Sequence, residues 1–193
     1  MKNILVLYYS KTGHTADLAR HVARGIEKHP ECSAHLHTIA PIDGTTPTDQ
    51  EPALSPEALA DFDGLVLGSP TYFGTIAAPV KHFLEQTSGL WLKGSLVNKP
   101  AGVFTSTGSL HGGQEATLWS MIIPLMHQGM LITGIPYQER GLSHTRSGGT
   151  PYGASHTAFS PDTPISDDER ALARALGLRV ATLAATLEVD DDA

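Results

Sequence analysis

The chain of 193 residues lacks several features that would place it in familiar classes of protein. It has one cysteine, Cys32, so it cannot form an internal disulfide, which is typical of a reducing cytoplasm. No apolar run approaches the roughly 20 residues that cross a bilayer. The apolar segment at the N-terminus leads into a polar loop rather than a small-residue cleavage site. We therefore expect a cytoplasmic protein that does not insert into a membrane.

Basic residues are also scarce, because 13 Lys and Arg face 20 Asp and Glu for a net charge of −7. No stripe of Lys or Arg suits a nucleic-acid backbone, so a nucleic-acid partner is not expected. His35 and His37 share one strand face, but no Cys or carboxylate is spaced to complete a metal site with them. We expect no metal. Any phosphate ligand must be held mainly by backbone N–H groups and hydroxyls.

Five short apolar segments alternate with helical patterns along the chain. The expected strands cover residues 4–9, 34–39, 65–68, 101–104 and 130–133. Helices are expected over 15–28, after Gly74 with an end near Thr87, and over about 114–128, and a last helix begins with the capping box Ser166–Glu169. Residues 41–56, with four prolines, indicate a surface loop. This pattern predicts one α/β domain over 1–193, with a frayed acidic tail at about 189–193.

Alternating strands and helices predict a doubly wound parallel sheet with helices on both faces. Ligands of such sheets bind beyond the carboxyl ends of the strands. Three loops rich in Gly, Ser and Thr leave expected strands one, three and four at that edge, so we expect them to converge.

The first of these loops, Ser10-Lys11-Thr12-Gly13-His14-Thr15, runs directly into a helix. The free N–H groups and the dipole of a helix N-terminus favour an anion. Three hydroxyls and one Lys suit a monophosphate better than a di- or triphosphate, and no Asp is placed to hold Mg²⁺. The alternative is a hydroxyl-rich helix cap without a ligand.

The other two loops suggest what is attached to the phosphate. Thr71-Tyr72-Phe73-Gly74 offers two aromatic rings and polar backbone groups that suit a planar heterocycle. The glycines of the stretch 106–113 allow a ligand to approach the backbone closely. Each loop alone is a weak signal, because aromatic residues after a strand are often part of the core.

The segments YYSKTGHT, SPTYFG and FTSTGSLHGGQE, together with SGLW, HQGM and GGTPYGA, resemble the WrbA-type NAD(P)H:quinone oxidoreductases of the flavodoxin-like superfamily. The resemblance extends over roughly residues 3–187 and is loosest over 40–54. It implies a five-stranded parallel sheet of order 2-1-3-4-5 and FMN as the cofactor, with NADH or NADPH as the electron donor. It also implies a quinone as substrate and a homotetramer with shared sites.

The resemblance assigns roles to particular residues. Ser10, Lys11, Thr12, Gly13, His14 and Thr15 would hold the phosphate, and Pro70, Thr71, Tyr72, Phe73, Gly74, Ser106, Thr107, Gly108, Ser109 and Gly112 would lie at the flavin ring. Trp91 would lie over the pocket of a neighbouring subunit, and residues 141–153 match an active-site insertion. The chain departs from the family at Thr12, Tyr72 and Gln128, so the sequence does not choose between NADH and NADPH.

Two electrons would pass from NAD(P)H to the quinone by a ping-pong mechanism, since the flavin carries the chemistry. His127 is the candidate catalytic and substrate-binding side chain, as a donor to the reduced quinone. It equally suits a cap at the C-terminus of the preceding helix. A flavodoxin-type electron carrier and an FMN-containing regulatory protein remain alternatives.

Overall fold

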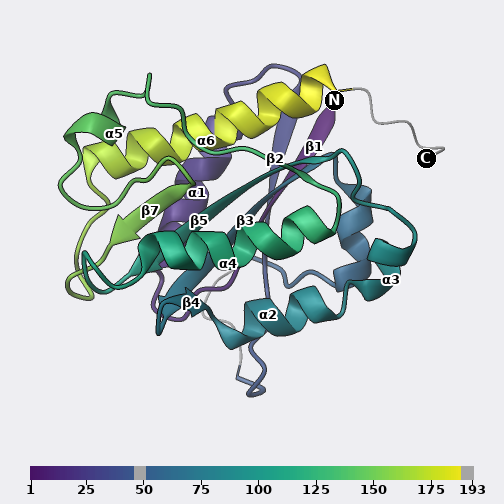
Figure 1. Cartoon of the computed structure of the whole chain (residues 1–193), viewed down its shortest axis with the longest axis horizontal. Coiled ribbons are helices and arrows are strands. Elements are labelled where there is room, and N and C mark those ends of the chain that lie inside the picture. Colours follow the sequence, from purple (N-terminus) through teal and green to yellow (C-terminus); the bar gives the residue numbers. More distant parts are fainter. Residues whose placement is uncertain (46–50, 188–193) are drawn as a thin grey trace.

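A computed structural model of the chain describes residues 1–45 and 51–187 (Figure 1). Its core is a parallel sheet of order β2-β1-β3-β5-β6. These strands are β1 (Lys2–Tyr8), β2 (Cys32–Thr38), β3 (Gly64–Tyr72), β5 (Pro100–Thr107) and β6 (Leu131–Ile132). They are the five expected strands in chain order, so the predicted doubly wound sheet of order 2-1-3-4-5 is confirmed.

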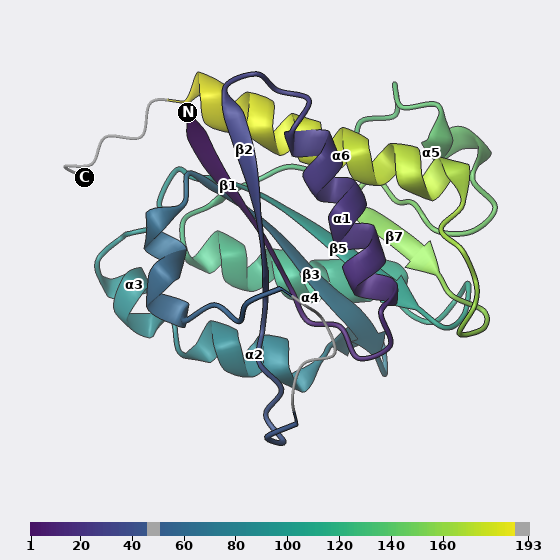
Figure 2. The ribbon, with the colours of Figure 1, turned by 180° about the vertical axis from the view of Figure 1, so that it is seen from behind.

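Helices cover both faces of the sheet, as the alternating pattern predicts. The helices α1 (His14–Ile26) and α6 (Asp167–Thr186) lie on one face, and Figure 2 shows them in front of the strands. The helices α2 (Ala78–Glu85) and α4 (Gln114–His127) lie on the other face. Apolar residues at helical spacing, such as Leu18 and Val22, are fully buried against the sheet.

The pair α1 and α6 packs with unusually close backbones. A Cβ at Gly25 would lie 2.1 Å from the Arg174 carbonyl oxygen, and one at Gly177 would lie 2.1 Å from the Val22 carbonyl oxygen. Only glycine fits at both positions. This contact fixes α6 relative to the helix that follows the first loop.

The fifth strand of the sheet consists of two pieces, which the sequence pattern did not predict. β6 pairs with the start of β5, and β7 (Ala154–Thr157) pairs in parallel with its end, from Phe104 to Thr107. Between them the chain leaves the sheet over residues 133–153 and returns. The two ends of this excursion meet where the Ile135 N–H donates to the Pro151 carbonyl at 2.9 Å.

Four further short elements lie outside the predicted pattern. β4 (Thr75–Ile76) pairs antiparallel with the end of β3, and a 3₁₀ helix covers Pro56–Asp61. Short helices cover Ser88–Leu92 (α3) and Gly141–His144 (α5). The acidic tail at 189–193 and part of the 41–56 loop lie outside the described residues. In the part that the structure describes, no helix is long and apolar enough to cross a membrane.

Candidate functional site

The three loops expected to converge line one hollow of about 340 Å³ beyond the carboxyl ends of β1, β3 and β5. The lining residues are Thr12, His14, Pro70, Thr71, Tyr72, Ser106, Thr107, Gly108, Ala158, Phe159, Ser160 and Pro161. The first eight belong to the three predicted loops, and the last four follow β7. The structure therefore brings together residues that the sequence places as much as 149 positions apart (12 to 161).

The first loop is built to leave donors free at the start of α1. Gly13 is the N-cap residue at φ 92°, a left-handed conformation that favours glycine, and it has no side chain of its own to cap the helix. The Ser10 hydroxyl oxygen accepts from the N–H of Gly13 at 3.2 Å and of Ala16 at 3.4 Å, so it holds the loop closed. Lys11 and Thr12 are exposed. The remaining N–H groups of the first turn suit an anion.

Buried hydroxyl contacts hold the three loops in register. Thr15 and Ser106 approach to 2.7 Å between their side-chain oxygens, which joins the first loop to the end of β5. Thr71 lies 3.0 Å from the Thr105 hydroxyl, which in turn donates to the Ser69 carbonyl. Such hydrogen bonds stabilise by about 1 kcal/mol each and fix the relative positions of the loops.

The loop after β3 presents its aromatic side chains to the surface. Phe73 is fully exposed and adopts a positive φ of 51°, and Gly74 follows at 79°. Tyr72 is 40% exposed and lines the hollow. Partial burial raises the pKa of its phenol, so it stays neutral and a donor at physiological pH. An exposed Phe in a left-handed turn is a strained, solvent-facing arrangement that a core residue would not adopt.

The third loop contains two glycines that no other residue can replace without movement. A Cβ at Gly112 would lie 2.5 Å from the Thr107 hydroxyl oxygen, and one at Gly113 would lie 2.7 Å from the Gly74 Cα. Gly113 is the N-cap of α4 at φ 95°, again without a side-chain cap. Ser109 accepts from the Gly112 N–H through its carbonyl. The N-terminus of α4 thus packs against the loop after β3.

A buried polar cluster lies behind the hollow, and the sequence analysis missed most of it. His156 of β7 and Glu169 of α6 are 3.0 Å apart between Nδ1 and Oε2, with both side chains 1% exposed. Glu169 forms the predicted capping box with Ser166. It also accepts from the backbone N–H groups of Gly148 and Thr157. Burial raises the pKa of Glu169, but the hydrogen bonds and the charge of His156 bring it down to about 2.

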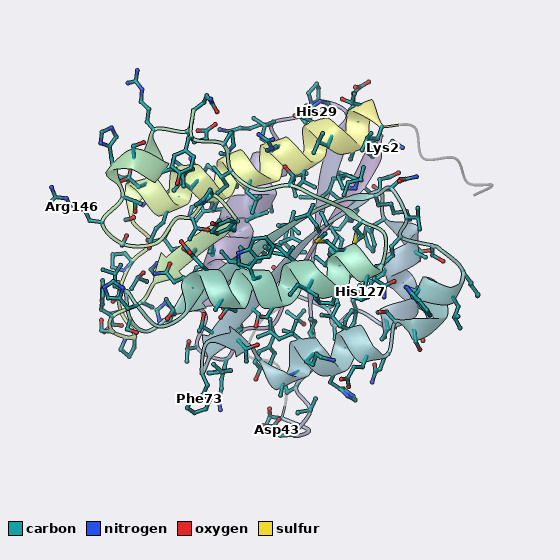
Figure 3. The ribbon with its side chains drawn as sticks, viewed as in Figure 1. Lys2, His29, Asp43, Phe73, His127 and Arg146 are labelled. Carbon is teal, nitrogen blue, oxygen red and sulfur yellow. The ribbon has the colours of Figure 1, made fainter. Side chains whose placement is uncertain are left out.

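Trp91 and His127 lie together in a second hollow of about 510 Å³ between α2, α3 and α4. They are not near the first hollow of the same chain. His127 is the last residue of α4, and Gln114 at the other end of this helix adjoins the third loop. About 20 Å of helix therefore separates His127 from the third loop. Figure 3 shows His127 and Phe73 well apart. Within one chain, neither Trp91 nor His127 is placed to contact a ligand in the first hollow.

The strand histidines are accounted for by local contacts. His35 lies 3.0 Å from Asn3 Oδ1 and its ring packs on Phe62, as does the ring of His37. Across residues 1–45 and 51–187, no group of three or more His, Cys, Asp and Glu is arranged to hold a metal ion.

Comparison with known proteins agrees with this geometry. The model of the family described as NADPH-dependent FMN reductase matches residues 3–136. A protein of Gluconacetobacter diazotrophicus named NAD(P)H dehydrogenase (quinone) is 41% identical over 97% of this chain and 99% of its own. A protein of the same name from Chromohalobacter salexigens is 39% identical over equal shares.

Among solved structures, the WrbA-like flavodoxin of Agrobacterium tumefaciens is similar with a TM-score of 0.70 and 26% identity. The match covers 97% of this chain and 100% of that one. The likeness therefore includes the segment 133–153 and β7, which lie mostly beyond the family-model match.

Proposed function

The chain belongs to the NADPH-dependent FMN reductase family, and from this premise we propose that it is an FMN-dependent NAD(P)H:quinone oxidoreductase. The observation that carries the proposal is the convergence of three loops on one hollow that is open to the surface. The names of the two curated relatives support the quinone as electron acceptor.

The residues of the hollow fit FMN. The remaining N–H groups in the first turn of α1 and the Thr12 hydroxyl suit its phosphate. Gly112 and Gly113 pack closely on Thr107 and Gly74, which holds the third loop against the loop after β3. Thr71 to Gly74 and Ser106 to Ser109 would border the flavin ring.

When bound, FMN supplies the redox chemistry, since flavins accept hydride from a nicotinamide and pass two electrons to a quinone. The chain's own residues bind and orient. Tyr72 and Phe73 leave the hollow open on the solvent side, so a nicotinamide and then a quinone can visit one place. This alternation is the ping-pong order that we propose.

We also assign Trp91 and His127 a role through a second copy of the chain. Their hollow carries exposed apolar side chains, with Trp91 and Ile123 each 54% exposed. Because neither residue reaches the first hollow of its own chain, a substrate contact requires another subunit, consistent with a homotetramer. The single thiol, Cys32, is buried and forms no disulfide, which supports a cytoplasmic location.

The test is the visible spectrum of the purified protein without oxygen, before and after NADH or NADPH and then after benzoquinone. The expected result is a yellow protein that bleaches with a pyridine nucleotide and recolours with the quinone. A yellow protein that ignores both nucleotides would replace the enzyme with an electron carrier. A protein that contains no flavin and takes up none would overturn the assignment of FMN.

A further inference from the structure

A chain of three side chains runs from the buried interior to the phosphate loop. Glu169 on α6 contacts His156 on β7, and the ring of His156 lies beside the ring of His14 at 5.5 Å between centroids. His14 is the first residue of α1 and lines the hollow. His14 lies within the residues that the family model matches, whereas His156 and Glu169 lie beyond them.

The unusual member of this chain is His156. Its side chain is fully buried, and its Nδ1 is held by Glu169. Its Nε2 has no hydrogen-bond partner among the described residues, although buried polar atoms almost always have one. The neighbouring ring on the site side is that of His14. An unpartnered nitrogen at this position indicates that His156 Nε2 gains a hydrogen-bond partner when a ligand occupies the hollow.

The phosphate loop lacks a buried cation. A flavin phosphate carries between one and two negative charges near neutral pH, because its second pKa is about 6. Lys11 is the only Lys or Arg within 10–15 and it is exposed. A protonated imidazole donates from both nitrogens, so His156 can serve Glu169 and its neighbour His14 at the same time.

We propose that His156, held by Glu169, is a positioning residue that in its protonated form orients His14 to donate to the FMN phosphate. This inference rests on the proposed function, because it concerns the same hollow. It makes phosphate recognition depend on pH, whereas recognition of the flavin ring does not.

Other charged groups around His156 do not replace this role. From β5 the register partner is Ser106, which does not titrate near neutral pH. Along α1, Asp17 and Arg20 pair with each other at the surface. Arg146 and Asp162 in the flanking loops are exposed, and Figure 3 shows Arg146 pointing away from the molecule. Further along the interface of α1 and α6, burial and the cations Arg24, Arg174 and Arg170 together lower the pKa of His21.

The experiment titrates the flavin-free protein with FMN and, in parallel, with riboflavin, which lacks the phosphate. Quenching of flavin fluorescence gives Kd from pH 5.5 to 8.5. The variant is His156→Asn, since the Asn side-chain N–H can replace Nδ1–H toward Glu169 but does not titrate. His82→Gln is the matched control, because His82 is an exposed histidine on α2.

For His156→Asn we expect FMN to bind about three- to tenfold more weakly at pH 6.5, with riboflavin unchanged. The dependence of the FMN-to-riboflavin affinity ratio on pH should also be flatter than in the unaltered protein and in His82→Gln. Titration of the phosphate itself cancels in this comparison, because it is common to all three proteins. An unchanged ratio with an unchanged pH profile would overturn the proposal.

If His156→Asn does not fold, the variant His14→Asn is tested instead. It keeps the buried pair of His156 and Glu169 and removes the imidazole ring between this pair and the ligand. A pH profile like that of the unaltered protein would then overturn the proposal. Binding of FMN without quinone turnover would refute the proposed enzymatic function. The role of His156 would still be tested by the ratio of FMN to riboflavin affinity. If the unaltered protein binds neither flavin, both fall together.

Discussion

Replacing Glu169 by Gln removes one charge from the most heavily hydrogen-bonded carboxylate in the described part of the chain. Its two oxygens accept from Gly148, His156, Thr157 and Ser166 at 2.8–3.0 Å. A Gln amide has one accepting oxygen, so two of these donors would face an N–H group instead. The four partners come from the 133–153 segment, β7 and the start of α6, so the substitution loosens three segments together.

The magnitude follows from the pKa. In the folded protein the pKa of Glu169 is about 2 against an ordinary value of 4.5, and such a shift corresponds to roughly 3 kcal/mol of folding free energy. Because the folded pKa is lowered, this stability is fully present above the unfolded pKa and is lost as the pH falls toward 2. Glu169→Gln should therefore destabilise by roughly 3 kcal/mol at pH 5.5 and by roughly 2 kcal/mol at pH 3.5.

Urea unfolding followed by circular dichroism measures this difference between pH 5.5 and 3.5, below the usual range of histidine titration. Asp168→Asn is the matched control, because it removes a charge from the same first turn of α6 and has no such partners. Its effect should stay within about 0.5 kcal/mol. A Glu169→Gln protein as stable as the control, or a difference that does not shrink with acid, would refute the reasoning.

Three further substitutions or reactions test the site. Gly113→Ala should lower the free energy of unfolding in urea by about 1–3 kcal/mol and weaken FMN binding, because the φ of Gly113 is left-handed and an added Cβ would meet Gly74. Gly89→Ala is the control, because a Cβ there meets nothing within 4 Å. His127→Ala should leave the Kd of FMN unchanged and slow quinone reduction at least about tenfold, and equal turnover would remove this residue from the mechanism. Cys32 is buried and its pKa is raised by burial, so a disulfide reagent should modify it only after urea unfolds the chain, and rapid reaction of the folded protein would contradict the burial.

The strands and the three site loops were predictable because their signals are local, whereas the order of the strands in the sheet came from the family resemblance. Each central strand is a short apolar run, and each site loop follows one of these runs directly. The capping box of Ser166 and Glu169 was also readable, since its two residues are three positions apart. The strands, the site loops and the capping box therefore follow from patterns within short stretches of the sequence.

The remaining features depend on contacts between distant segments. β7 has the polar sequence Ala-Ser-His-Thr, and its burial is stabilised by Gln114, which bonds both Ser155 and Thr157, and by Glu169. No periodicity marks such a strand. The separation of His127 from the first hollow follows from the length of α4, which placed the residue at the wrong end of a helix for contact within one chain.

The divided fifth strand lets the chain change length without altering its architecture. β6 stops at the partner of Ala101 and β7 starts at the partner of Phe104, so only Gly102 and Val103 of β5 lie between the two pieces. Residues 133–153 begin and end close to the same part of β5. If they were removed, two residues could join Ile132 to Ala154 opposite Gly102 and Val103. The segment between β6 and β7 can therefore be shorter, with one continuous strand beside β5, or longer. Neither change alters the phosphate loop.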